Sequence, residues 1–583
     1  MSQNLSSISI NNLAPNASSV KRILMSVLDS ILGVKKMNEL YQAHDMQGLS
    51  KEAFADKLIE VLQLDITGIE ALQAKIPKVG PVVIASNHPF GGIEGVILAR
   101  AIGEVRPDLK VLANKGLGIF RELKDYFIFT NPLSPNDPQN APSLRQCVKQ
   151  INNQGALLIF PAGKVSYFEK SKGGISECPW NKLVGRLVNI DQCLFVPVFV
   201  SGKNSHLFYR VERLFFKLRM LLLGRELLNK SGASISISAG TAINSKRFNK
   251  TLNNDSRADL CRALSYAQES TWRYQWPADL VQKQQPIIAE IEKAQLKKEL
   301  AALPANQKLV KVKRFSAYYG YQHQMPSVVT EIARLRELVF RQHNEGSGEP
   351  LDTDRFDATY THLFIVDDVQ EKIVGAYRMG LTDRLIEKEG LEGLYLHKMF
   401  KFNPSFVNQT EPAMEMGRSF LIPEMQGSYQ GLLMLWKGIG AFVSQFPQYR
   451  TLYGTVSISK LYDARSVKLI EQALIEPNSH QDVAPRHTLN FEMHPEIAAL
   501  AHQLPLAEHL STYLASTEED GKDIPILAKQ YQKLGAKFHA LGIDTSFNHT
   551  PGLLLSVHLP SAPEKLLKLY LGDTYQRYMS FKK

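Results

Sequence analysis

The N-terminal half of the chain alternates between two hydrophobic patterns. Apolar residues recur at helical spacing in segments such as EAFADKLIEVLQLDI (52–66) and VILARAIGEVRP (96–107). Short apolar runs typical of buried strands lie between and after them, at VVIAS (82–86), ALLIFPAG (156–163) and CLFVPVFVSG (193–202). Helices that alternate with buried strands predict an α/β layer architecture for this half.

The second half follows a different order of elements. A strand-like start (308–321) precedes a helical segment and two strand patterns, of which the second is KIVGAYRMG (372–380). The strand pattern PAMEMGRSFLIPEM (412–425), an apolar helix (432–443) and the strand TLYGTVSIS (451–459) come next. This order predicts an α+β domain.

A polar stretch rich in Lys and Gln separates the two patterns, over residues 280–305. A chain of 583 residues is too long for one hydrophobic core. We therefore predict one domain over residues 1–290, with a loose arm over about residues 1–20, and a second domain over residues 291–583.

A predicted strand of the first half ends at a turn that carries an imidazole. The stretch VVIASNHPFGGIEG (82–95) presents His88, and the carboxylate of Glu94 follows six residues later. A helix that begins near Gly92 brings Glu94 back towards His88, where the carboxylate holds the ring in one tautomer and stabilises its charged form. The pattern predicts a general base. An isolated pair at this spacing is also typical of a polar turn with a capping histidine.

Three further segments of this half carry groups suited to an anionic or acyl ligand: NKGLGIFRELKD (114–125), FPAGKVS (160–166) and VPVFVSGKNS (196–205). The candidate ligand-binding residues of these segments and of the turn after Ser86 are Asn87, Gly91, Gly92, Lys115, Arg121, Pro161, Gly163, Lys164 and Pro197. Taken alone, the cations of the first segment are typical of a solvated surface, and a glycine after a strand is typical of a turn.

In this order the four segments resemble the motifs of the lysophospholipid acyltransferase family, in particular its haemolysin-like branch. The resemblance implies that His88 deprotonates a hydroxyl, that Glu94 orients the ring, and that Pro197 lies beside the acyl channel. It also implies that Lys115 or Arg121 holds an anionic head group or a carrier phosphate.

The same resemblance implies an oxyanion hole of backbone donors near Gly91 and Gly92, or around Gly163. Two features differ from the usual motifs. Five residues rather than four separate His88 from its acid, which is Glu instead of Asp, and Ala162 stands where the third motif has Glu. The second difference points to an acceptor built differently from a glycerol.

The stretches EMGRSF and LYGTVSIS of the second half, in their order of elements, resemble the GNAT acyltransferase fold, in particular its N-acyl-amino-acid and ornithine N-acyltransferase branch. The resemblance implies that Glu415 and Arg418 are the candidate catalytic residues, Glu415 as the base for an amine nucleophile and Arg418 as a partner for a carboxylate or phosphate. Taken alone, the two residues are typical of a cross-strand ion pair.

The GNAT resemblance implies that a carrier phosphate meets the start of the helix after EMGRSF, at Gln430 and Gly431. The usual glycine-rich loop is present only loosely, as QGSYQG (426–431), which leaves acyl carrier protein and coenzyme A both open as donors. Polar and small residues of the tail are further candidates for an amine pocket, with none singled out: Asp523, Tyr531, Gly535, Asp544 and Asn548.

Composition and charge limit the partners and the cellular location that we expect for the protein. A net charge of +11 fits an anionic membrane surface or an acidic carrier as well as nucleic acid, and no nucleic-acid-binding signature favours the last. The four cysteines lack metal-ligand spacing, and no signal-peptide core or long apolar run is evident. We expect a cytoplasmic protein, peripheral on the inner face of the cell membrane. The basic, apolar stretch 211–228 is typical either of an interfacial helix or of a core helix.

Together the two resemblances imply a bifunctional lipid acyltransferase, similar to fused ornithine-lipid synthases, without a bound cofactor or metal. The second domain would transfer a 3-hydroxyacyl group from acyl carrier protein, or from coenzyme A, to the α-amine of ornithine. The first domain would then esterify the 3-hydroxyl of this lyso-lipid. The alternatives are the same folds acting on glycine, another amino acid or a lysophospholipid, and a non-catalytic protein that binds lipid or membrane.

Overall fold

The apolar runs and helical segments fold into two units in a computed structural model, unit 1 from residues 1–273 and 493–522, and unit 2 from 274–492 and 523–583. The structure describes residues 18–19, 25–26 and 33–581, except 132–136, 139, 171–173, 215–221, 249–251, 270–283, 407–410, 476–481, 490–496 and 498–505. This division differs from the predicted one mainly by the segment 493–522, which belongs to unit 1 although it follows most of unit 2 in sequence.

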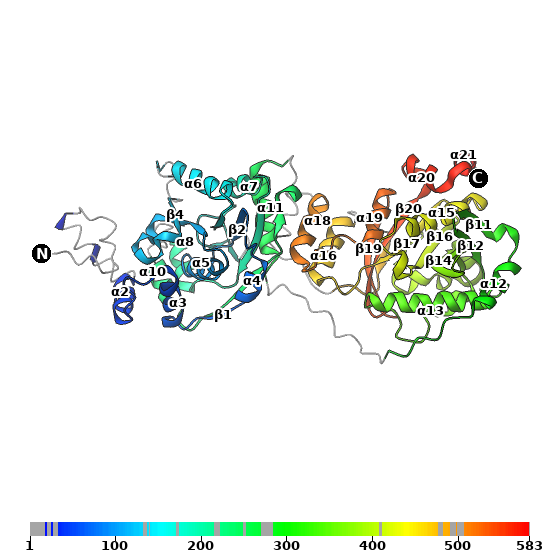
Figure 1. Ribbon diagram of the computed structural model, residues 1–583, viewed down its shortest axis with the longest axis horizontal. Coiled ribbons are helices and arrows are strands. Elements are labelled where there is room, and N and C mark those ends of the chain that lie inside the picture. Colours follow the sequence, from blue (N-terminus) through cyan, green and yellow to red (C-terminus); the bar gives the residue numbers. More distant parts are fainter. Residues whose placement is uncertain are drawn as a thin grey trace. The chain divides into compact units, whose positions relative to one another are not determined.

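An eight-stranded sheet forms the centre of unit 1 (Figure 1). Its order is β1 (Asp65–Thr67), β9 (Ser234–Ala239), β8 (Leu194–Val200), β2 (Val82–Ser86), β5 (Ala156–Ile159), β3 (Lys110–Asn114) and β4 (Phe127–Thr130), with β10 (Ile243–Asn244) beside β8. Strand β2 is parallel to β5 and β8, and each of its residues is buried. Strands buried on both faces read as continuous apolar runs, and the predicted α/β architecture is confirmed.

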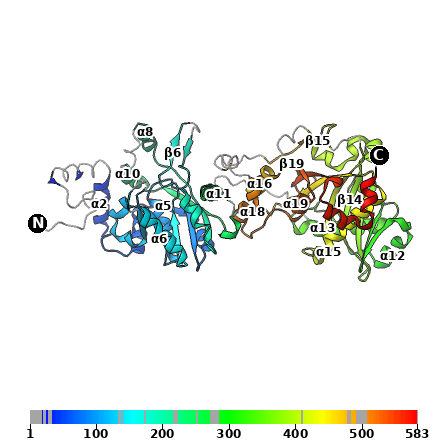
Figure 2. The same ribbon diagram turned by 90° about the horizontal axis from the view of Figure 1, so that it is seen from above.

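The helices of unit 1 are α2 (Val34–Ala43), α3 (Lys51–Val61), α4 (Ile69–Lys75), α5 (Ile93–Val105), α6 (Asn140–Asn152), α7 (Lys182–Leu187), α8 (His206–Leu214), α10 (Leu223–Leu228), α11 (Asn254–Tyr266) and α18 (Leu506–Thr517). Helix α5 follows β2 after a short turn. A hairpin of β6 (Tyr167–Glu169) and β7 (Gly174–Ser176) carries β6 beside α8 (Figure 2).

Helix α18 is an integral part of unit 1. Leu510 and Leu514 are fully buried, and the backbone carbonyl of Ser516 accepts the Thr241 N–H at 3.2 Å. The two segments of the chain approach so closely here that a Cβ atom at Gly240 would lie 2.8 Å from the Ser516 carbonyl oxygen. Unit 1 is therefore completed by residues from the far end of the sequence.

The sheet of unit 2 also has eight strands, β11 (Lys308–Val312), β12 (Phe315–Gly320), β13 (Thr361–Asp367), β14 (Lys372–Leu381), β16 (Ala413–Leu421), β17 (Thr451–Ser457), β20 (Thr550–His558) and β19 (Lys537–Asp544), in this order. The predicted strand-like start is a hairpin, because Lys313 adopts a left-handed φ of 55° between β11 and β12. Strands β16 and β17 are parallel neighbours, paired only as far as Met416 and Gly454. Beyond these residues the two strands part.

Helices cover this sheet, among them α13 and α15 (Figure 1). The helices of unit 2 are α12 (Lys293–Ala302), α13 (Pro326–Gln342), α14 (Thr382–Glu389), α15 (Tyr429–Gln445), α16 (Ala464–Leu474), α19 (Ile526–Lys533), α20 (Glu564–Leu571) and α21 (Tyr575–Ser580). Strands β15 (Phe400–Phe402) and β18 (Val483–Pro485) form a small second sheet. Within the described residues, no helix is both long enough and apolar enough to cross a bilayer.

Candidate functional sites

The predicted histidine and its acid meet at the carboxyl end of β2. The turn after β2 presents His88, and Glu94 lies in the first turn of α5. The His88 Nδ1 and Glu94 Oε1 atoms are 3.0 Å apart, with Glu94 fully buried and the His88 side chain 18% exposed. This geometry matches the predicted pairing of an imidazole with an orienting carboxylate.

Backbone donors hold the Glu94 carboxylate. Its Oε1 accepts the N–H groups of Phe90 and Gly91, and its Oε2 accepts the N–H of Gly92, each at 2.9 Å. Burial alone would raise the pKa of Glu94, but the charge and hydrogen bond of His88 and these N–H groups lower the pKa to about 2. The N–H groups of Gly91 and Gly92 are therefore engaged, so the structure does not support them as oxyanion donors.

A second buried carboxylate supports the backbone of the histidine. The His88 N–H donates to Glu177 Oε1 at 2.5 Å, and the Glu177 carboxylate also accepts Trp180 Nε1–H at 3.0 Å and the Tyr266 hydroxyl at 3.2 Å. Burial raises the pKa of Glu177. On the other side, the Phe160 ring lies 4.7 Å from the His88 ring, centroid to centroid. Glu177 therefore holds the backbone of His88, while Glu94 and Phe160 hold its ring.

A large cavity opens in front of His88. Its volume is about 710 Å³, and the predicted residues Gly91, Gly92, Pro161, Gly163 and Lys164 line it together with His88. Most of the remaining wall is apolar. The elements α2, α5, β3 and α10 contribute to it, for example with Val34, Met37, Val96, Val111, Leu223 and Leu227. A cavity of this size and lining suits a long hydrocarbon chain.

Four predicted ligand-binding residues lie outside this cavity, Asn87, Lys115, Arg121 and Pro197. The Asn87 amide joins β2 to β8, because its Nδ2 donates to the Val200 carbonyl at 2.9 Å and its Oδ1 accepts the Val200 N–H at 2.7 Å. Lys115 pairs with Asp137 at 3.2 Å, and Arg121 is exposed. Pro197 is an interior residue of β8.

The basic, apolar stretch 211–228 is described only in part. Lys217 and Arg219 lie outside the described residues, while Arg225 is exposed on α10.

In unit 2 the predicted base Glu415 is buried on β16. Its Oε1 accepts the Tyr360 hydroxyl at 2.9 Å and the Leu396 N–H at 3.3 Å, and its Oε2 accepts the Tyr453 hydroxyl at 3.2 Å. Burial raises the pKa of Glu415 to about 7, although these three donors act in the opposite direction. A carboxyl group poised near neutral pH suits a general base.

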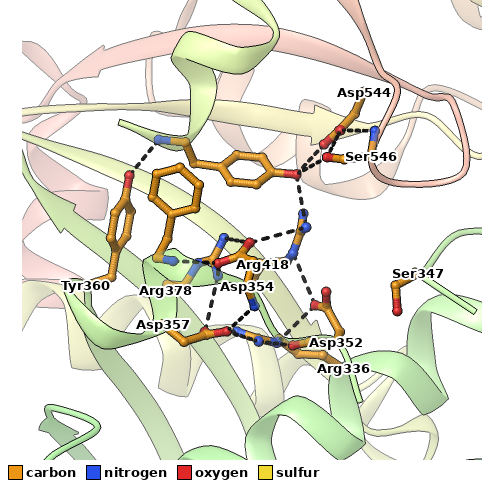
Figure 3. Close-up of polar contacts among 12 residues, drawn as sticks. Arg336, Ser347, Asp352, Asp354, Asp357, Tyr360, Arg378, Arg418, Asp544 and Ser546 are labelled. Atoms are coloured by element: carbon orange, nitrogen blue, oxygen red, sulfur yellow. Dashed lines mark hydrogen bonds and ion pairs between the residues drawn. The ribbon is translucent and has the colours of Figure 1, made fainter. Parts of the chain in front are cut away.

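The predicted Arg418 belongs to an interleaved network of arginines and aspartates rather than to an ion pair with Glu415 (Figure 3). It takes a left-handed φ of 50° on β16, its Nε lies 3.1 Å from Asp352 Oδ2, and its Nη2 donates to the Tyr395 hydroxyl at 3.0 Å. The ion pairs of the network join Arg336, Arg378 and Arg418 to Asp352, Asp354 and Asp357. The Tyr395 hydroxyl in turn donates to Asp544 at 2.6 Å.

A small cavity of about 90 Å³ lies where β16 and β17 part. Residues of both strands line it beyond their last paired residues, on one side Gly417, Arg418 and Ser419 and on the other Thr455, Val456 and Ser457. The carboxyl groups of Glu345, Glu415 and Asp544 also line it. Glu415 and Arg418 thus line one shared cavity, at the place where β16 and β17 no longer pair with each other and an extended ligand can pair with the main chain of either strand.

Gln430 and Gly431 lie in the first turn of α15, and neither lines this cavity. The Gln430 N–H donates to the Ser428 hydroxyl, which caps the helix at 3.2 Å, and Gly431 is buried. Of the tail candidates, Asp544 lines the cavity, the Tyr531 ring packs edge-to-face with Trp436, and the Asn548 side chain donates to the Asn344 carbonyl.

Sequence reasoning missed several residues of both sites, namely Glu177, Glu345, Asp352, Asp354, Asp357, Tyr360, Arg378, Tyr395 and Tyr453. Each comes from a segment distant in sequence from the motif that it serves. Arg378 and Tyr453 lie within β14 and β17, and the others lie in the connections between helices and strands. One signal was present, the density of charged and aromatic residues in DTDRFDATY (352–360).

Comparison with known proteins agrees with this geometry. Residues 64–268 match the family model described as "Acyltransferase", and residues 335–437 match "Acetyltransferase (GNAT) domain". A "Glycine N(alpha)-acyltransferase" of Bacteroides thetaiotaomicron is 28% identical over 48% of this chain and 86% of its own length. A "Lyso-glycine lipid O-acyltransferase" of the same organism is 25% identical over 42% of this chain and 90% of its own length.

The protein is therefore an enzyme that transfers acyl groups, with an acyltransferase domain followed by a GNAT domain. The predicted pair of folds is confirmed. The two matched regions contain both candidate bases, since His88 lies within the first and Glu415 within the second.

Proposed function

We propose that unit 2 transfers a 3-hydroxyacyl group from a thioester to the α-amine of an amino acid, and that unit 1 esterifies the 3-hydroxyl of the product. The result is a diacylated amino acid lipid. The observation that carries the proposal is the pairing of two different bases with two different cavities. A large apolar cavity faces His88, and a small polar one faces Glu415.

In unit 2 the small cavity suits an amino acid. Glu415 takes a proton from the α-ammonium, the free amine attacks the thioester carbonyl, an amide C–N bond forms and the C–S bond breaks. The thiol leaves with a proton. Tyr360 and Tyr453 hold the Glu415 carboxylate in place throughout, because both hydroxyls donate to it.

In unit 1 the large cavity suits the acyl chain of a lyso-lipid. The His88 ring takes the proton of the 3-hydroxyl as the oxygen attacks a second thioester, and the same proton then neutralises the departing thiolate. Glu94 stays ionised and stabilises the imidazolium that forms. Lys164 lines this cavity and is placed to stabilise negative charge on the thioester oxygen.

Ornithine is our first candidate for the acceptor, because the motifs of the second half resemble ornithine N-acyltransferases. Glycine is the second candidate, because the relatives reported above are named for glycine and for lyso-glycine lipid. Expression in a host that lacks both lipids, followed by mass spectrometry of the lipid extract, tests the proposal. The expected products are an N-acyl amino acid and its O-acylated form, and their absence would contradict it.

The donor that we propose is an acyl carrier protein thioester, with acyl-CoA as the alternative. We also propose that the enzyme works in the cytoplasm, bound peripherally to the inner face of the cell membrane, where the lyso-lipid accumulates. Fractionation of cells, and assays that compare the two thioesters, test these points.

A further inference from the structure

Glu345 is a buried carboxyl group that the proposed chemistry does not use. It follows α13 in a loop, is 7% exposed, and lines the same cavity as Glu415. Its carboxylate bonds to the Ser457 hydroxyl, and the positive charge of Arg418 acts on it as well. Among the described residues it forms no ion pair with a lysine or arginine, whereas Asp352, Asp354 and Asp357 each contact an arginine. A buried carboxylate that lines a cavity and has no direct ion pair of its own is placed to bind a cationic group of a ligand.

Carboxyl groups outnumber arginines around this cavity. The three arginines of the network form ion pairs with Asp352, Asp354 and Asp357. The charges of Arg378 and Arg418 also act on the three cavity acids Glu345, Glu415 and Asp544, so three guanidinium groups are shared by six carboxyl groups. Burial raises the pKa of Glu345 to about 7, so in the empty cavity a proton partly neutralises the excess. A ligand that carries more positive than negative charge would take the place of that proton.

The two glutamates contact different positions along β17. Glu415 is paired in register with Tyr453, while Glu345 bonds to Ser457 on the same strand. The main-chain positions of these two partners, four residues apart, are separated by roughly 13 Å. A glycine has no side chain that could reach from one glutamate towards the other, whereas an amino acid with a terminal amine extends in that direction. Phe340 and Phe547 line the cavity as well, and aromatic rings favour an ammonium group.

We propose that Glu345 binds the side-chain ammonium of a dibasic amino acid acceptor, and that it selects such an acceptor over glycine. This inference rests on the N-acyltransferase function proposed for unit 2. It makes Glu345 a specificity residue, while the α-ammonium is deprotonated at Glu415.

The test uses the purified full chain, 3-hydroxyhexadecanoyl-CoA, and three acceptors: ornithine, norvaline, which has the same carbon chain without the terminal amine, and glycine. The wild type should prefer ornithine in kcat/KM. Glu345→Gln should reduce the preference for ornithine over norvaline by about 10–100-fold, because a charged hydrogen bond is lost. Glu345→Asp should restore part of it. Glu349→Gln is the matched control, since this exposed acid of the same loop does not line the cavity and its carboxylate accepts a hydrogen bond from Gln285 at 2.8 Å.

Thermal denaturation of each variant checks that unit 2 is folded, and O-acylation of a supplied N-acyl amino acid in the same samples checks unit 1. Equal losses for all three acceptors, or a wild type that prefers glycine, would overturn the selection by Glu345 and leave the N-acyltransferase function standing. A wild type that acylates none of the three would overturn both.

Discussion

Glu94 in unit 1 and Glu415 in unit 2 are both buried carboxyl groups beside a cavity, but their pKa values shift in opposite directions. Glu94 contacts His88 and accepts three main-chain N–H groups, and its pKa falls to about 2. Glu415 accepts two tyrosine hydroxyls and one N–H without an ion pair, and its pKa rises to about 7. Burial penalises both charges, so the partners decide the outcome.

This difference assigns the two carboxylates different roles. A carboxylate that stays ionised at all working pH values can orient and stabilise a protonated histidine but cannot exchange protons itself. A carboxyl group that titrates near neutral pH can take up a proton directly. The two cavities also differ in size and in lining. The cavity of unit 1 has a volume of about 710 Å³ and is mostly apolar, whereas that of unit 2 has a volume of about 90 Å³ and is lined by charged groups.

The largest effect is expected from His88→Ala. Loss of a general base costs roughly 10²–10⁴-fold in rate, so O-acylation should almost stop while N-acylation continues, and the N-acyl amino acid should accumulate. Product ratios from the full chain, measured by mass spectrometry, check this. His44→Ala is the matched control at an exposed position of unit 1. O-acylation at the wild-type rate in His88→Ala would show that the base lies elsewhere.

The second test concerns the pH dependence of unit 2. Glu415 must be deprotonated to act, so kcat/KM for N-acylation should fall about tenfold per pH unit below pH 7, and Glu415→Gln should remove most of the activity. The groups that face Glu415 are Tyr360, Tyr453, the Leu396 N–H and the charge of Arg378. The exposed Glu424→Gln should keep the wild-type profile. If the residual activity of Glu415→Gln still falls at low pH as the wild-type activity does, another carboxyl group such as Glu345 is the titrating residue.

The two sites also differ in how far the sequence predicted them. His88 and Glu94 lie on one strand–turn–helix stretch, so local spacing brings them together, and most of the glycine- and proline-bearing turn residues do line the cavity. In unit 2, Tyr395 and Asp544 are hydrogen-bonded although 149 residues separate them. No local pattern encodes such a contact, which depends on the order of strands in the sheet.

The fold was predicted better than its long-range contacts for the same reason. Apolar periodicity located β2, β5, β8, β14, β16, α5 and α15. It did not reveal that α18 completes unit 1, because the apolar face of a helix does not specify which partner it covers. The turn motif after Ser86 suggested Asn87 as a ligand-binding residue, whereas its amide binds the Val200 backbone, a contact between residues 113 positions apart in sequence.

An intermediate effect is expected from Glu94→Gln. The carboxylate uses Oε1 for two N–H groups and for His88, and Oε2 for a third N–H. A glutamine has a single acceptor oxygen, so its NH2 group would face a donor. We expect the free energy of unfolding of unit 1 to fall by about 1–3 kcal/mol, with O-acylation reduced more than N-acylation. Chemical denaturation and both assays measure this. Glu104→Gln, an exposed position on the same helix, is the control.

The smallest effect is expected from Glu177→Gln, which tests whether unit 1 depends on a second carboxylate behind the histidine. Glutamine keeps an acceptor for the His88 N–H, which donates to Glu177 at 2.5 Å, but it removes a negative charge beside the imidazolium that forms during transfer. We expect kcat for O-acylation to fall by about tenfold or less, which corresponds to one weakened charge-assisted hydrogen bond. KM for the lyso-lipid should hold steady, since Glu177 is not a cavity residue.

Asp191→Asn, at an exposed position of unit 1, controls for the loss of charge in general. A purely structural role for Glu177 would instead lower the melting temperature and reduce active enzyme without changing kcat per folded site. Active-site titration together with thermal denaturation separates these outcomes. If kcat per folded site is unchanged in Glu177→Gln, the Glu94 carboxylate alone stabilises the charged ring, and unit 1 resembles unit 2 in relying on a single catalytic carboxyl group.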